Sequence, residues 1–221
     1  MAGFWLDLWK RRNIITAQYS HFLQSNMETF NKIHQHFTYP TKVWGKDDVY
    51  LRPCPVSAKA GVYAFYFKEI PGKIPVKDCI KFGHLILLYL GVSPARKNSK
   101  QNLRTRIRSH YTGNASGSTL RLTLGCLLSH DLGIELRRTG KSGRLTFVNG
   151  EKKLSEWISK NAFVAWRTID RPWEYEEDLI NKISVPLNLD HNKKHKFHEV
   201  LSKIRSEAKH RARSSPVVMK T

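Results

Sequence analysis

Residues 102–111 contain two side chains that could act together on a phosphate group. Read at 3.6 residues per turn, the stretch predicts a short helix with Asn102 as its N-cap and three residues on one apolar stripe: Leu103, Ile107 and Tyr111. Arg106 and His110 lie four residues apart along one border of that stripe. A guanidinium is suited to hold a phosphate, and an imidazole is suited to relay a proton. The alternative is a basic surface helix that is only well solvated.

A second feature is a cluster of acidic residues, which is unusual in so basic a chain. Five of the 18 acidic residues lie close together: Asp170, Glu174, Glu176, Glu177 and Asp178. On a helix that starts near Trp173, Glu176 falls in the middle of the apolar side. An inward-facing carboxylate costs free energy unless it is paired or binds a metal. A buried salt bridge and a metal site both stay open at this point.

Two segments rich in aromatic and aliphatic residues are expected to form the strands that position these side chains. Residues 61–67 read as a strand that places Tyr63 on one face together with two phenylalanines. Residues 85–91 are apolar on both faces, which predicts a central strand. Tyr89 lies near the end of that strand, and Gly91 would let the backbone come close to a ligand. The alternative is that both tyrosines are ordinary strand aromatics.

The rest of the chain is expected to surround these elements. We predict a further strand at residues 162–166, a hairpin at 134–148 and helices at 17–36, 119–129 and 154–160. This pattern divides the chain into an accessory segment (1–58), a core (59–192) with an insertion at about 113–160, and a basic C-terminal helix or tail (193–221). The tail is expected to contact phosphates or to be disordered.

Composition limits the class of partner. The chain has 38 Lys and Arg residues against 18 Asp and Glu residues, a formal net charge of +20. This balance favours nucleic acid over a membrane, because no long basic amphipathic segment is present. Three distant cysteines favour a reducing compartment over a zinc ribbon or a disulfide framework. Since no signal-peptide pattern and no membrane-length apolar run is found, we expect a cytoplasmic, nucleoid-associated protein.

Four short motifs, taken in order, resemble those of the GIY-YIG nuclease superfamily. The first two are Gly61-Val62-Tyr63 and Tyr89-Leu90-Gly91. The third is N-L-x-x-R-I at residues 102–107, and the fourth is E-x-x-L-I followed by P-x-N, at residues 176–188. Each triplet alone is a weak signal, but the four together in this order are a specific one. The resemblance spans roughly residues 60–190 and is to stand-alone bacterial or phage members, with some likeness to restriction endonucleases at His110.

The resemblance implies an α+β fold, with a small antiparallel sheet flanked by helices as the GIY-YIG-like core. The N-terminal helical extension, the inserted hairpin and helices, and the basic C-terminal tail would be additions to it. It also implies an endonuclease that hydrolyses phosphodiester bonds in DNA with one Mg²⁺ or Mn²⁺ ion in each active site. The catalytic residues carried over are Tyr63, Tyr89, Arg106, His110, Glu176 and Asn188.

Each of these residues has an expected role. Glu176 would hold the metal, and Arg106 would stabilise negative charge on the phosphate. Tyr63 would deprotonate water, although its reference pKa near ~10 makes it a poor base without a nearby cation. His110 would take the Tyr63 proton or orient the water, and Tyr89 would position either group. Asn188 would orient Glu176 or its metal shell.

Six basic residues are expected to contact the nucleic acid: Arg96, Lys97, Lys100, Arg104, Arg108 and Arg121. The main alternative function is a non-catalytic nucleic-acid-binding module with a decayed nuclease site. RNA also stays open as a substrate, because net charge does not separate it from DNA. A homodimer would suit double-strand cleavage, but no residue pattern indicates one.

Overall fold

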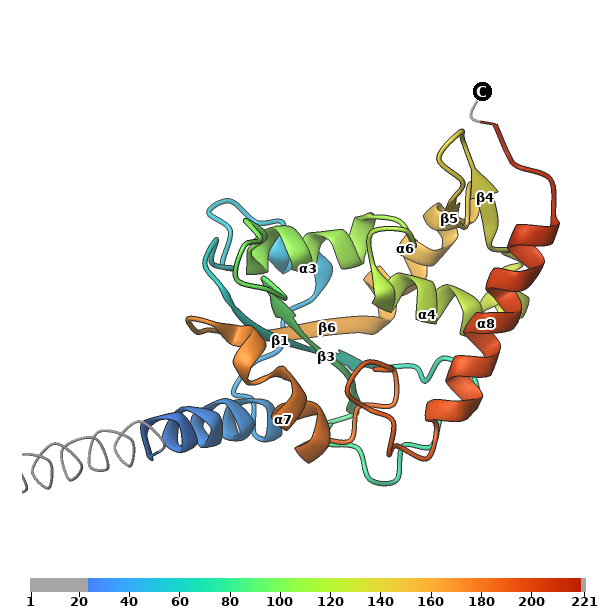
Figure 1. The fold of residues 1–221 in the computed structure, drawn as a ribbon. Coiled ribbons are helices and arrows are strands. Elements are labelled where there is room, and N and C mark those ends of the chain that lie inside the picture. The colour runs from blue at the N-terminus through green and yellow to red at the C-terminus, as the bar shows by residue number, and fades with distance from the viewer. Residues whose placement is uncertain (1–23, 220–221) are drawn as a thin grey trace, which may run out of the picture.

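The computed structural model describes residues 24–219, and its centre is an antiparallel sheet with the strand order β2-β3-β1-β6 (Figure 1). The strands of this sheet are β1 (Gly61–Phe67), β2 (Lys81–Phe82), β3 (Leu85–Ser93) and β6 (Ala162–Thr168). A separate hairpin consists of β4 (Arg137–Thr139) and β5 (Arg144–Thr146). The α+β class, the hairpin and the three long strands predicted from the sequence are therefore confirmed.

Helices surround the sheet. They are α2 (Lys46–Val49), α3 (Leu103–Thr112), α4 (Thr119–Leu127), α5 (Ser129–Leu132), α6 (Gly150–Asn161), α7 (Glu176–Lys182) and α8 (His198–Ser214), with a 3₁₀ turn η1 (Pro172–Glu174) before α7. Residues 24–38 are also helical, in agreement with the helix predicted there, whereas residues 17–23 of that prediction lie outside the described chain. The N-cap of α3 is confirmed, because the Asn102 side chain accepts a hydrogen bond from the Thr105 amide at 3.0 Å.

The sheet is covered on both faces, and every residue of β1 is buried. The face that carries Tyr63, Phe65 and Phe67 packs against apolar residues of α3, α4 and α6. The opposite face, which carries Val62, Ala64 and Tyr66, packs against the 24–38 helix and α7. The predicted two-residue alternation is thus confirmed. Figure 1 shows α3 and α7 on opposite sides of the sheet. A site formed by side chains from both helices must therefore lie at an edge of the sheet.

The basic C-terminal region is folded, rather than disordered, over the residues that the structure describes there, 193–219. Helix α8 packs against α4 and β4 and buries three of its residues: Leu201, Ala208 and Ala212. These three residues form an apolar stripe that packs one face of α8 against the rest of the protein. The buried stripe explains why so basic a stretch is helical. All three cysteines are free thiols. Across residues 24–219 no helix is both long and apolar enough to cross a bilayer.

Candidate active site

A cavity of about 420 Å³ lies alongside β3 and collects residues from distant parts of the chain. Its lining includes five of the six catalytic candidates: Tyr63, Tyr89, Arg106, Glu176 and Asn188. The structure therefore brings the guanidinium on α3 and the carboxylate on α7 to one cavity together with two phenols. The sixth candidate, His110, is fully buried and contacts Tyr63 instead of the cavity.

Gly91 in the second motif leaves space for the side chain of Tyr63 in the first motif. Tyr63 on β1 pairs in register with Gly91 on β3. A Cβ atom at position 91 would lie 2.5 Å from the Tyr63 hydroxyl and 2.7 Å from its Cζ atom. Because Tyr63 is only 1% exposed, its ring has no room to move aside. Gly91 is thus required by the close approach of a side chain, in addition to lining the cavity where a ligand would bind.

Arg106 points from α3 to the cavity and is held at two of its nitrogens. Its Nε donates to the Tyr63 hydroxyl at 3.3 Å, and Nη1 donates to the Gly117 carbonyl at 2.8 Å. A guanidinium has five N–H donors, so several stay available to phosphate oxygens. Burial lowers the pKa of Arg106, but the neighbouring phenols of Tyr63 and Tyr89 raise it by more.

The Tyr63 hydroxyl also contacts His110, with 2.7 Å between Oη and Nε2. Burial, followed by the Tyr89 phenol, raises the pKa of Tyr63 well above its ordinary value, while Arg106 acts in the opposite direction. Burial, followed by the Arg106 and Arg121 charges, holds the pKa of His110 well below its ordinary value. The pair therefore consists of a neutral phenol and a neutral imidazole at neutral pH.

Glu176 is the first residue of α7, half-buried, and lines the cavity. Within residues 24–219 no basic side chain lies within 4.0 Å of its carboxylate, so the salt-bridge alternative is not observed there. Burial raises the pKa of Glu176 and Asp190 raises it further, whereas His191 and Arg106 lower it. An inward carboxylate without an ion pair is costly, which leaves the metal alternative in place.

Asn188 lines the cavity with the other candidates, but its side chain has a different hydrogen-bond partner from the one expected. Both ends of its amide bind the backbone of Leu90 on β3, with Oδ1 accepting at 3.0 Å and Nδ2 donating at 2.7 Å. The adjacent Leu187 amide donates to the Leu88 carbonyl at 3.0 Å. Strand β2 pairs only with the first two residues of β3. The segment after α7 therefore supplies hydrogen-bond partners to backbone groups further along the same edge of β3. Asn188 therefore fixes the segment after α7 to β3 rather than contacting Glu176.

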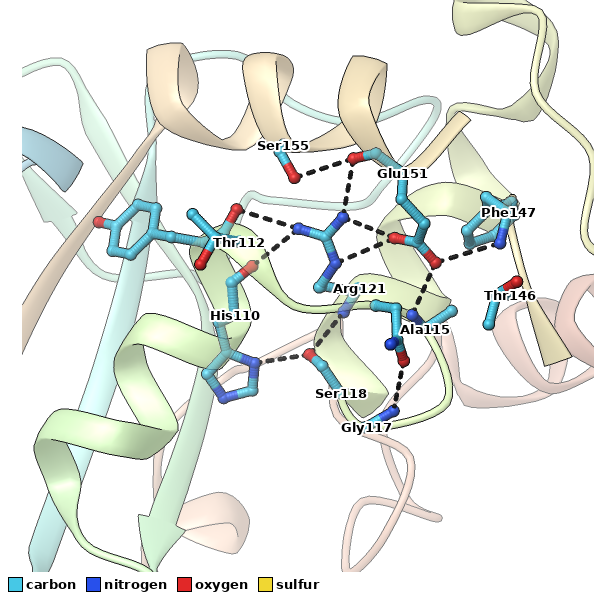
Figure 2. A network of polar contacts seen from close by, with 12 residues as sticks. His110, Thr112, Ala115, Gly117, Ser118, Arg121, Thr146, Phe147, Glu151 and Ser155 are labelled. Carbon is cyan, nitrogen blue, oxygen red and sulfur yellow. Dashed lines mark hydrogen bonds and ion pairs between the residues drawn. The ribbon is translucent and has the colours of Figure 1, made fainter. Parts of the chain in front are cut away.

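Of the predicted nucleic-acid contacts, Arg121 is wrong. It is fully buried and forms an ion pair with Glu151 at 2.6 Å, as Figure 2 shows. Helix α6 covers the side of α4 that carries Arg121 and supplies the carboxylate. A buried, paired guanidinium is not available to a phosphate.

The other five basic candidates fall into two groups. Arg96, Lys97 and Lys100 are exposed on the loop after β3, whose Ala95 and Gln101 line the cavity. Arg104 and Arg108 are half-buried and donate to the carbonyls of the segment before β1, at Val56 and Val49. The loop residues are therefore the more accessible set.

Three charged or titratable residues that line the cavity were not predicted as site residues: Asp190, His191 and Arg205. Asp190 and His191 closely follow Asn188, so the motif itself could have drawn attention to them. His191 also has a φ of 60°, which is uncommon outside glycine. Arg205 lies on α8, and nothing in the local sequence separates it from the other basic residues there.

The small antiparallel sheet flanked by helices agrees with the GIY-YIG-like core that the four motifs implied. A family model described as the GIY-YIG catalytic domain matches residues 61–207, which is well over half of the chain. The chain therefore belongs to the GIY-YIG family, and that membership implies nuclease activity. Neither a curated protein nor a solved structure matches the chain.

Proposed function

We propose that this protein is a metal-dependent endonuclease that hydrolyses phosphodiester bonds in DNA. The observation that carries the proposal is the shared cavity: a half-buried carboxylate, Glu176, faces the same space as Arg106 and two tyrosines. Nuclease chemistry needs a place for a cation, a donor for phosphate oxygens and a group near the attacking water. These side chains supply all three.

The cavity suits one Mg²⁺ or Mn²⁺ ion. Glu176 has no ion-pair partner in the described part of the chain, and Asp190 lines the same cavity. Residues 24–219 contain no cluster of three or more typical metal ligands. Mg²⁺ can bind without such a cluster, because it keeps most of its waters and needs only one or two carboxylates. When bound, the ion would act as a Lewis acid on the scissile phosphate and favour the phenolate of Tyr63.

The protein's own groups have separate tasks in the proposed reaction. Arg106 binds phosphate oxygens with the N–H groups that Tyr63 and Gly117 leave free. Tyr63 lines the cavity and, after its own proton has left to solvent, accepts a proton from the attacking water as the phenolate. The oxygen of that water then bonds to phosphorus, the bond to the 3′ oxygen breaks, and the 3′ oxygen takes a proton from solvent. Tyr89, whose hydroxyl lies 3.3 Å from the Thr119 hydroxyl, confines the water on the other side.

DNA is supported as the substrate by charge and by where that charge is exposed. The net charge of +20 favours a polyanion, and Arg96, Lys97 and Lys100 are exposed on a loop that borders the cavity. Arg205 adds a guanidinium to the cavity wall from α8. Contacts to phosphate alone do not distinguish DNA from RNA, so the test includes both.

The direct test is incubation of the purified protein with supercoiled plasmid, with and without Mg²⁺, beside Glu176→Gln. Asp178→Asn is a matched control, because Asp178 is an exposed carboxylate on the same helix. We expect nicking or linearisation that requires both metal and Glu176 and that survives in the control. A single-stranded and a folded RNA are tested in parallel.

Each outcome has a distinct meaning. Cleavage of RNA alone would overturn the assignment of DNA but not that of a nuclease. Tight binding without cleavage, across many sequences and metals, would instead support a binding module with a decayed site. Discrete fragments would indicate a recognition sequence, and a smear would indicate cleavage without one.

A further inference from the structure

Three consecutive residues at the start of α4 contact three side chains of the candidate active site. The Gly117 carbonyl accepts from Arg106, the Ser118 hydroxyl lies 2.7 Å from Nδ1 of His110, and the Thr119 hydroxyl lies 3.3 Å from the Tyr89 hydroxyl. These residues lie in the predicted insertion, outside the four motifs that resemble the family. The tripeptide of residues 117–119 therefore contacts the candidate catalytic side chains from behind, and the four motifs did not reveal it.

The buried Arg121–Glu151 pair fixes this tripeptide against α3 (Figure 2). Nη1 of Arg121 donates to the carbonyls of His110 and Tyr111 at 3.3 and 3.0 Å, which ties α4 to the end of α3. Glu151 also accepts from the Ala115 amide at 2.8 Å and so holds the loop before Ser118. Ser118 is consequently fixed at hydrogen-bonding distance from His110.

The hydrogen bonds around Ser118 distinguish the two neutral forms of His110. The Ser118 hydroxyl accepts from the Arg121 amide at 3.1 Å, and within the described residues its only other partner is Nδ1 of His110. If Nδ1 carried the proton, the Ser118 hydrogen would have no acceptor among those residues, although Ser118 is only 2% exposed. If Ser118 donates to Nδ1, the Ser118 hydroxyl is satisfied both as donor and as acceptor.

The second arrangement leaves the Tyr63 hydrogen, instead of the Ser118 hydrogen, without an acceptor among the described residues, and Tyr63 lines the cavity whereas Ser118 does not. With the imidazole proton on Nε2, His110 donates to the Tyr63 oxygen at 2.7 Å, beside the donor from Arg106 at 3.3 Å. The hydrogen of Tyr63 is then free to point into the cavity that its side chain lines. Two donors on one phenol oxygen stabilise its anion.

We infer that Ser118 is a positioning residue, which fixes the imidazole of His110 with its proton on Nε2 so that His110 donates to the Tyr63 oxygen. In this arrangement His110 does not take the Tyr63 proton. It assists Arg106 in stabilising the phenolate, and the Tyr63 proton leaves through the cavity to solvent. The catalytic consequence rests on the proposed function, whereas the protonation of His110 does not.

The test is a ¹⁵N spectrum of the imidazole side chains of the full-length protein at neutral pH. The His110 signals are identified by their loss in His110→Gln. We expect the pattern of an imidazole protonated on Nε2 and unprotonated on Nδ1. Ser118→Ala removes the donor and should produce a mixture of both forms, while Ser118→Thr keeps the hydroxyl and should retain the Nε2-protonated pattern.

A His110 protonated on Nδ1 in the unaltered protein would overturn the inference, whether or not the protein cleaves DNA. Retention of the Nε2 pattern in folded Ser118→Ala would also overturn it, because Ser118 would then not fix the tautomer. If the protein does cleave, Ser118→Ala should lower kcat by about tenfold or more with little change in KM, and Ser118→Thr should restore it.

Discussion

Substitution of Arg121 by methionine tests whether this arginine holds the fold together or contacts nucleic acid. The side chain is fully buried and donates five hydrogen bonds through its three nitrogens, to Glu151 and to the carbonyls of His110, Tyr111 and Glu151. Methionine has similar length and no charge, so it fills the space while it leaves these acceptors without their donor.

The structure sets the expected magnitude. Removal of one partner from a buried ion pair costs roughly 3–5 kcal/mol. The Glu151 carboxylate keeps two backbone donors, Ala115 at 2.8 Å and Phe147 at 3.1 Å, and its side chain is 15% exposed. These contacts place the expected loss near the lower end, about 3 kcal/mol. For a chain of this size, that corresponds to a fall in Tm of about 6–12 °C.

The measurement is thermal and urea unfolding of Arg121→Met, with DNA binding measured on the same samples below the transition. Arg96→Met is the matched control, because Arg96 is exposed and should leave Tm unchanged. Addition of Glu151→Gln to Arg121→Met should recover part of the loss, since it removes the unpaired charge and keeps an acceptor for the two amides. An unchanged Tm together with a weaker, less salt-dependent affinity for DNA would refute the structural role.

Three further predictions concern the cavity. Gly91→Ala should lower the free energy of unfolding by about 1–3 kcal/mol and reduce cleavage, because its Cβ would overlap the Tyr63 ring; normal activity would contradict the close packing. His110 stays neutral when folded, since burial and two guanidinium groups lower its pKa, whereas the unfolded chain takes up a proton below about pH 6.5. Stability should therefore fall with decreasing pH by up to ~1.4 kcal/mol per unit, and urea titrations of His110→Gln should show a shallower fall. Arg205→Gln should weaken DNA binding and make its salt dependence less steep by about one unit, as binding at several salt concentrations would show; an unchanged slope would exclude a phosphate contact.

The sequence by itself determined the local elements and the identity of most candidate residues. Alternation along Gly61–Phe67 placed Tyr63 on the correct face of β1, and the Asn102 cap set the start of α3. These features depend on contacts within one element, which recur with the period of the helix or strand. The order of the four motifs then predicted a shared site for Arg106 and Glu176, and both residues line the same cavity.

Only the tertiary structure decided what covers each face and which partner each polar group has. Arg121 is buried because Glu151, 30 residues away, approaches from α6, and Asn188 binds Leu90, 98 residues away, instead of Glu176. The contact of Ser118 with His110 likewise depends on the packing of α4 against α3. A helical pattern shows which face of a helix is apolar, but not which neighbour will lie against its polar side, because that depends on how distant elements pack together.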